Sequence, residues 1–546
     1  MNTWRYSGVA VFALVTGVLH AQPDTAELRK ELDALKNDYE SRIEALETRI
    51  RELEENQARP APAPSSTAMR GGGSASSRVP APPPEEKTAD DETALRLEQS
   101  QRFRSPTEIR EITTRGDWES PLGERIENVL EGFLDINGYF RAGYGRSDQD
   151  GPQRAFGIPG FAKYRLGNEA ENYGELAFEK TFFPAGFFRG GPSAQDGPVA
   201  HMVYRLSFVN PYDDYGSSAD TDFGAPELWG SIANVIPGMP DVKVWAGERF
   251  YRRHDIHIND FYFWDMSGGG GGIEDIPAGP GKLAFAWIGD GSESAIYSRA
   301  ISPDPLNVAG FSKTNFDLRY YDWPFLGGKG EVGVVVSTTN SGVDSNGRQA
   351  DDSTGAALSL VRTEEGFLDP QSLHKTSLQI GSGPAKTFTS SFETFSDATG
   401  TYIRPDPEES WRFRFTDQVV VKPADHFSVG GSFVYQFTDF GGNVDDQHWL
   451  SGGVRPIWHL NDVFSIALET GVDWVSDVPG GTGGTLGKIT LAPQVSLGDQ
   501  FFSRPVLRTF LTYALWDDDL KGSVGGPDYA TETSGFTWGV QMESWW

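Results

Sequence analysis

From residue 133 to its end, the chain repeats short segments in which apolar and polar residues alternate. In the first of them, Ile136 and Phe140 lie on one side of the alternation, and Asn137 and Arg141 lie on the other. Successive side chains of a β-strand point to opposite faces, so each segment predicts a strand with one apolar and one polar face. The same pattern recurs in FSVGGSFVYQF (427–437), FSIALETGVDW (464–474) and FTWGVQMESWW (536–546), and turn-rich stretches such as PGGTGGT (479–485) separate such segments.

Many half-polar strands fit either a soluble sandwich or propeller, or a transmembrane barrel with lipid outside and water inside. The last segment favours the barrel. Its even-numbered residues, from Phe536 to Trp546, are largely apolar with aromatic residues at both ends, as expected of a lipid-facing band with two aromatic girdles. Trp545 lies on the opposite face with Gln541 and Glu543. We therefore predict an all-β fold, an antiparallel transmembrane β-barrel whose lumen contains Trp545.

Composition excludes two other classes of protein. Beyond the N-terminus, no stretch approaches the roughly 18 consecutive apolar residues that a membrane-spanning helix requires. The net charge of −30 argues against a nucleic-acid partner, because phosphate contacts require clustered Lys and Arg. The chain has no cysteine, so an exported fold would be held by hydrogen-bonded structure without disulfides.

The N-terminal region differs from the remainder in composition. Arg5, a short apolar run and Ala21 follow the order of a secretory signal peptide. Leucines and isoleucines spaced three and four residues apart then predict a coiled coil with one stutter at Tyr39, and hence an oligomer; a single amphipathic helix packed on a domain is the alternative. We divide the chain into a signal peptide (1–21), a coiled coil (22–57), a disordered linker rich in Pro, Ala, Gly and Ser (58–103), a partly helical segment (104–132) and the barrel (133–546).

Residues 252–268, RRHDIHINDFYFWDMSG, combine charged, histidine and aromatic residues without the apolar pattern of a buried strand or a surface helix. They predict a long loop or an inward-folded segment. Three interpretations stay open. His254 and His257 with Asp255 and Asp260 have the donor groups of a metal site. A solvated surface loop is the second interpretation, and the lining of a narrow polar passage, with charges and aromatic planes facing a ligand, is the third.

Several longer motifs stand in the barrel region: GYFRAGYG (138–145), KYRLGNEAENYGEL (163–176), WAGERFYRRHDIHINDFYFWDMSG (245–268), SRPVLRTFLTYALW (503–516) and the ending WGVQMESWW. Through these motifs the chain resembles the maltoporins over roughly residues 133–546. This resemblance implies a trimeric, 18-stranded outer-membrane barrel that passes maltose and maltodextrins by facilitated diffusion, without a cofactor. The coiled coil resembles the periplasmic N-terminal extension of the related sucrose porin.

The resemblance also implies a sugar-binding row of aromatic residues, the greasy slide, flanked by a polar track. Flat rings would meet the apolar face of a pyranose, and charged groups would meet its hydroxyls. Carried over motif by motif, the slide comprises Tyr139, Tyr173, Phe502, Trp545 and, from a neighbouring subunit's loop, Tyr215. The polar track comprises Arg141, Arg165, Glu175, Arg253, Asp255 and Asp260, with Tyr262 as the constriction residue opposite the slide.

Three positions depart from the family's pattern. Gly224 stands where an arginine of the track is expected, Leu373 where the slide has phenylalanine, and Ala170 where relatives have cysteine. These departures leave the sugar open. The leading hypothesis is a sugar-selective porin. The alternatives are a general or anion-preferring porin, and a tether that contacts the periplasm or cell wall through the coiled coil. An enzyme using Asp255 and Asp260 is the weakest, because glycosidases need two carboxyl groups placed across a bound sugar.

Overall fold

The structure is a computed structural model of the 546-residue chain. It describes residues 135–182, 197–211, 222–291, 312–343, 349–392, 394–397, 400–403, 408–442, 445–478 and 481–546. The predicted signal peptide, coiled coil, linker and partly helical segment lie outside the described residues, as does Tyr215. In the part of the chain that the structure describes, no helix is long and apolar enough to cross a membrane.

Within the described ranges, eighteen strands form one sheet. These strands are β1 (Asp135–Ser147), β2 (Glu171–Phe182), β3 (Val199–Pro211), β4 (Asp222–Ala233), β5 (Lys243–Arg249), β8 (Gly268–Ala278), β9 (Gly281–Gly291), β10 (Ser312–Phe325), β11 (Gly328–Thr339), β14 (Ser353–Glu365), β15 (Leu373–Ser382), β18 (Trp411–Ala424), β19 (Phe427–Asp439), β20 (Gln447–His459), β21 (Phe464–Val478), β22 (Gly481–Ser496), β23 (Val506–Trp516) and β24 (Ser534–Trp545).

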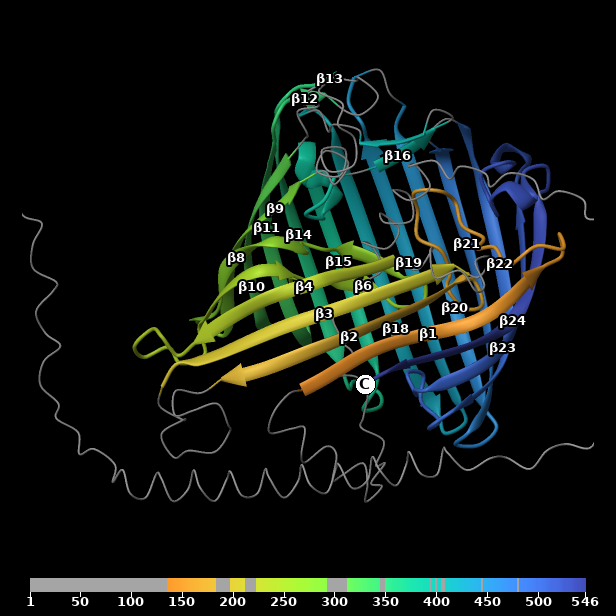
Figure 1. The fold of residues 1–546 in the computed structure, drawn as a ribbon, viewed down its shortest axis with the longest axis horizontal. Helices are drawn as coiled ribbons and strands as arrows, with labels where there is room; N and C mark the ends of the chain where they lie inside the picture. Colours follow the sequence, from red (N-terminus) through yellow and green to blue (C-terminus); the bar gives the residue numbers. More distant parts are fainter. Residues whose placement is uncertain are drawn as a thin grey trace, which may run out of the picture. The chain divides into compact units, whose positions relative to one another are not determined.

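These eighteen strands form the wall. Each of them pairs antiparallel with the next one along the chain, and β1 also pairs with β24. The sheet therefore closes on itself as a barrel (Figure 1). Closure satisfies the hydrogen-bonding groups of both edge strands, which an open sheet in lipid could not do. The predicted fold class, a closed antiparallel barrel of eighteen strands, is confirmed.

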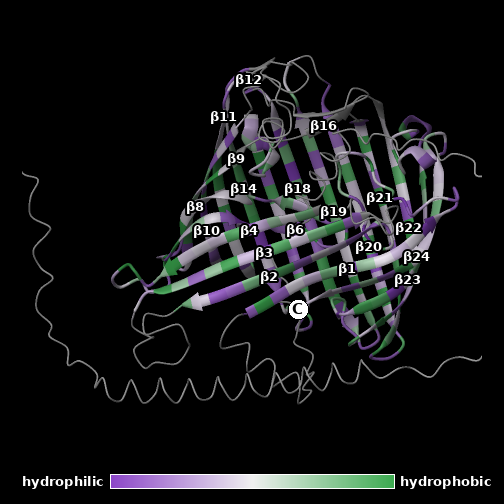
Figure 2. Cartoon of the chain, in the orientation of Figure 1, coloured by the Kyte–Doolittle hydropathy of each residue, from purple (hydrophilic) through white to green (hydrophobic). Residues whose placement is uncertain are grey.

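Burial alternates residue by residue along the wall. In β23, Arg508 and Thr512 are buried inside the barrel, whereas Leu507 and Leu511 are exposed on its outer face. Figure 2 shows the corresponding alternation of hydrophilic and hydrophobic residues along the strands. The turn-rich stretch 479–485 partly belongs to the wall, because β22 already begins at Gly481.

The end of β24 has the predicted parity. Trp545 is 8% exposed and pairs with Tyr139 of β1, whereas Trp546 is 52% exposed on the outer face. The ring of Trp546 lies over Gly138, where an added Cβ would come within 2.4 Å of it. The two adjacent tryptophans therefore face different surroundings, and Gly138 provides the space that the outer one needs.

Shorter elements lie in the connections between wall strands. They are the strand pairs β6 (His254–Ile256) with β7 (Phe261–Trp264), β12 (Gly342–Val343) with β13 (Gln349–Ala350), and β16 (Thr394–Asp397) with β17 (Gly400–Ile403), and the 3-10 helices η2 (Gly383–Thr387), η3 (Asp518–Leu520) and η4 (Pro527–Tyr529).

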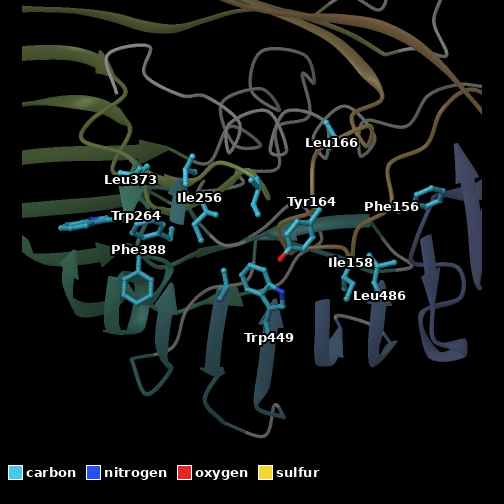
Figure 3. Close-up of a cluster of buried hydrophobic side chains, with 14 of the residues drawn as sticks. Phe156, Ile158, Tyr164, Leu166, Ile256, Trp264, Leu373, Phe388, Trp449 and Leu486 are labelled. Atoms are coloured by element: carbon cyan, nitrogen blue, oxygen red, sulfur yellow. The ribbon is translucent and has the colours of Figure 1, made fainter. Parts of the chain in front are cut away.

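Apolar side chains from the loops and the inner face of the wall form a buried cluster inside the barrel (Figure 3). Tyr164 belongs to the first loop, which we define as residues 148–170 between β1 and β2. Its hydroxyl hydrogen-bonds with Ser451 Oγ at 3.0 Å, and its ring fills the space over Gly471, where a Cβ would lie 2.1 Å from the ring. The first loop thus folds into the barrel and packs against β20 and β21.

Candidate functional site

The connection between β5 and β8 crosses the interior of the barrel. We call residues 250–267 the inner loop. His257 in this loop contacts the ring of Trp545 on β24 at 6.1 Å, and Trp264 packs over Gly333 of β11. Because β24 and β11 lie in different parts of the wall, the loop spans the lumen. The inward-folded interpretation is confirmed, and the solvated surface loop is wrong because most of these side chains are buried.

Side chains of the wall hold the backbone of the inner loop. Arg319 of β10 donates to the Arg252 carbonyl at 2.8 Å, and Arg414 of β18 donates to the Phe263 carbonyl at 2.8 Å. Gln418, also on β18, donates to the Asp255 carbonyl at 2.7 Å. Such bonds satisfy backbone groups that a buried loop cannot expose to water.

Two non-glycine residues of the inner loop have left-handed backbone angles. The φ angle is 44° at Arg252 and 53° at Asp260. This conformation is unfavourable for residues with a Cβ and persists only where surrounding contacts impose it. Asp260 has such a contact, because its carboxylate lies 3.9 Å from the Arg165 guanidinium in the first loop. The two infolded loops therefore meet at this ion pair.

Three predicted slide residues form a row on the inner wall. The ring centres of Tyr139 and Trp545 are 6.4 Å apart with planes 9° from parallel, and those of Tyr139 and Tyr173 are 5.8 Å apart. Their strands β24, β1 and β2 are neighbours, and the register pairs Tyr139 with Trp545 and Arg141 with Tyr173. The row therefore follows from barrel closure, which joins the two ends of the sheet.

Charged groups border this row. Arg141 pairs with Glu169 at 2.6 Å and with Glu171, and Arg165 donates to the Tyr139 hydroxyl at 2.9 Å. The Tyr173 hydroxyl donates to Glu175 at 2.6 Å. Aromatic faces and ionised groups are thus adjacent, as recognition of a polyhydroxylated ring requires.

Arg165 lies in the first loop, outside the wall strands. Burial lowers its pKa, but the carboxylate of Glu169 and the nearby Tyr139, Glu543 and Asp260 raise it more, so the pKa of Arg165 ends well above its ordinary value. Its guanidinium is therefore charged at neutral pH.

Arg253 and Tyr262 come together in the inner loop. The Arg253 guanidinium lies over the rings of Phe250 at 3.7 Å and Tyr262 at 4.8 Å. Arg253 is 1% exposed, and within the described residues none of its three side-chain nitrogens has a hydrogen-bond partner. It also interacts electrostatically with Glu175. Buried charged donors are costly to leave unsatisfied, so this group is suited to an incoming acceptor.

Phe502 lies apart from the row and is joined to it through the inner loop. The His257 ring meets Phe502 edge-on at 5.0 Å and Trp545 edge-on at 6.1 Å. His257 therefore contacts both Phe502 and Trp545, and Phe502 is only 4% exposed. Of the remaining predicted residues, Asp255 is buried in the inner loop.

Sequence reasoning missed several charged residues beside the row. Glu543 is bound by Arg165 at 3.0 Å, by Arg508 at 3.1 Å and by Arg504 at 3.2 Å. Arg455 of β20 pairs with Glu469 of β21 at 2.5 Å. Arg504 and Arg508 both lie in the motif SRPVLRTF, and the inward parity of Arg508 and Glu543 could have signalled them.

Two other expectations concern metal and the departures from the family pattern. Among the described residues, no group of three or more His, Asp or Glu side chains is arranged to hold a metal ion. Leu373, at a predicted slide position, is buried in the apolar cluster. An added Cβ at Gly224 would lie 2.9 Å from the Ser207 hydroxyl, so the backbone and Ser207 are close at this point.

A closed barrel with an apolar outer face, a charged lumen and infolded loops defines an outer-membrane porin. The family model for LamB porin matches residues 134–546, and the chain belongs to this family. The protein is therefore an outer-membrane channel.

Solved structures also match the chain, at low sequence identity. OccAB1 of Acinetobacter baumannii is 9% identical with a TM-score of 0.40, and covers 76% of this chain and 98% of its own. An anion-selective porin from Comamonas acidovorans is 12% identical with a TM-score of 0.35, and covers 76% and 99%. OmpT of Vibrio cholerae, in its trimer form, is 9% identical with a TM-score of 0.34, and covers 76% and 99%.

Proposed function

We propose that this porin is sugar-selective and mediates facilitated diffusion of maltose, maltodextrins or related oligosaccharides. The row of Trp545, Tyr139 and Tyr173, bordered by Arg141 and Arg165, is the observation that carries the proposal. A pyranose has an apolar face of C–H groups and a rim of hydroxyls, and this row offers a partner for each. Several modest contacts in series let a ligand bind without being trapped.

The charged groups of the inner loop support the same role. Arg253 carries buried donors without hydrogen-bond partners among the described residues, and sugar hydroxyls are suitable acceptors. Asp255, Asp260, Glu175 and Tyr262 complete the polar side of the passage in this proposal. Phe502, which contacts the same His257 ring as Trp545, extends the slide in this proposal.

We also propose that the functional unit is a homotrimer embedded in outer-membrane lipid, in which Tyr215 serves a neighbouring subunit's pore. Its N-terminal extension would lie in the periplasm. A barrel beginning at residue 132 should still run as a trimer on native gels in detergent. A monomeric truncated barrel would contradict this part of the proposal.

Single-channel recording tests the transport function. The current through a wild-type channel in a planar bilayer is titrated with maltotriose and, as a control, with a polyethylene glycol of similar size. Binding predicts a saturable block by maltotriose, whereas the polymer should lower the current without saturation. Equal, non-saturable effects of both solutes would indicate a general porin.

A further inference from the structure

Three arginines border the slide on the side of β20 to β24. We call Arg455 of β20, Arg504 of the turn at 497–505 and Arg508 of β23 the basic wall. Their side chains are each at least nine-tenths buried from solvent. They are not among the residues assigned above to sugar recognition, so their role needs its own explanation.

The basic wall carries more positive charge than its carboxylate partners neutralise. Arg504 and Arg508 share the single carboxylate of Glu543, and Arg165 draws on the same group. Arg455 shares Glu469 with Lys488. Among the described residues, the three arginines and Lys488 thus contact two carboxylates, whereas Arg165 also pairs with Glu169 and Asp260.

Two guanidinium nitrogens of the basic wall have hydrogen-bonding capacity left over. Within the described residues, Nε of Arg504 and Nε of Arg508 are buried without a hydrogen-bond partner. Burial and the neighbouring guanidinium groups of Arg508 and Arg455, opposed by Glu543, lower the pKa of Arg504 to about 9, so it remains protonated at neutral pH. A charged donor left unsatisfied in this way is stabilised by an added anion.

The basic wall lies directly against Trp545 of the row and against Phe501, whose ring packs on that of Phe502. The Arg504 guanidinium is 4.1 Å from the ring centre of Trp545, and that of Arg455 is 5.8 Å from Phe501. A uronic acid carries its carboxylate at the rim of the pyranose ring. A uronate stacked on this row would therefore bring its carboxylate to the arginines that already bind Glu543.

We propose that the basic wall is a carboxylate-binding site and that the preferred substrates are acidic oligosaccharides built from uronic acids. This inference rests on the proposed sugar transport and narrows its substrate class. The chain carries a net charge of −30, so the field of the whole molecule opposes anions. A preference for an acidic sugar must then come from local arginines, whose fork of donors matches a carboxylate.

The test compares maltotriose with trigalacturonate, a trisaccharide of similar length that carries three carboxylates at neutral pH. Each is titrated against the single-channel current of the wild-type protein. We expect trigalacturonate to block at a concentration at least severalfold lower than maltotriose, and the difference to shrink as salt is raised. Block by maltotriose alone, or equal block by both, would overturn the inference while leaving sugar transport standing. Block by neither would overturn both.

Arg508→Gln and Arg508→Lys then locate the preference. We expect the glutamine variant to lower the affinity ratio of trigalacturonate to maltotriose by roughly tenfold, because it loses the charge that binds the carboxylate. A tenfold change corresponds to about 1.4 kcal/mol of binding free energy. The lysine variant keeps the charge and should retain most of the ratio, and it also controls for misfolding. An unchanged ratio in Arg508→Gln channels would refute the role of the basic wall.

Discussion

The outer and inner faces of the same wall are determined in different ways. Outside, Leu507 and Leu511 are exposed on the lipid-facing surface, and the alternation of polar and apolar residues is enough to predict them. Inside, Arg319 pairs with Asp317 and Glu331 and donates to a carbonyl of the inner loop. Each outer residue therefore contributes a small, independent amount to the stability of the barrel, whereas the inner residues contribute as connected groups.

Removing Arg319 should give the largest effect. Arg319→Met leaves the buried carboxylates of Asp317 and Glu331 without this cation, a loss that typically costs about 3–5 kcal/mol. We expect the barrel to unfold at a much lower temperature when samples are heated in detergent and run on gels. We also expect the open-channel current to become noisy, because the inner loop is held less firmly.

Leu318→Ala is the matched control, because Leu318 is the preceding residue and lies exposed on the outer face. It should leave the current noise unchanged. Equal effects of the two substitutions would mean that the faces do not differ as described.

A side chain added at Gly333, in the space that the Trp264 ring occupies, should have a smaller effect. A Cβ at Gly333 would lie 2.4 Å from the Trp264 ring, so Gly333→Val must displace the inner loop, at an overpacking cost of about 1–3 kcal/mol. Gly452 has no atom within 4 Å of an added Cβ, and Gly452→Val serves as the control. Single-channel conductance should shift in the first variant and not in the second. Matching conductances would show that Trp264 does not fix the loop.

Shortening Tyr262 tests whether the inner loop narrows the passage. Tyr262→Ala removes a ring packed beside the Arg253 guanidinium, so we expect the ion conductance to rise while the barrel keeps its stability. Conductance is measured in the absence of sugar. If it stays at the wild-type value, the loop does not limit the passage of ions.

The sequence allowed the wall to be predicted because a period of two is a local property. It identified β24 and the opposite orientations of Trp545 and Trp546 without knowledge of any partner strand. The row of Tyr139, Tyr173 and Trp545 needed more, namely the family resemblance, since barrel closure alone joins β24 to β1.

The interior contacts could not be predicted in the same way. Arg319 and the Arg252 carbonyl are 67 residues apart, and no periodicity relates them. The sequence makes His257 a candidate metal ligand, yet its ring contacts Phe502 and Trp545. Likewise, the convergence of Arg504 and Arg508 on Glu543 depends on loop folding and strand register together. Tertiary contacts across the lumen, rather than local pattern, determine these positions.

The central claim is that the inner face of β24 binds saccharide and its outer face does not, and sugar titration of adjacent tryptophan variants tests it most directly. An aromatic contact is worth about 0.5–1.5 kcal/mol beyond area burial, so Trp545→Ala should weaken block of the current by maltotriose severalfold in channels that still assemble. Trp546→Ala should reduce insertion into the membrane and leave the binding constant of the surviving channels unchanged. A reversal of these two phenotypes, or unchanged block in Trp545→Ala channels, would contradict the account.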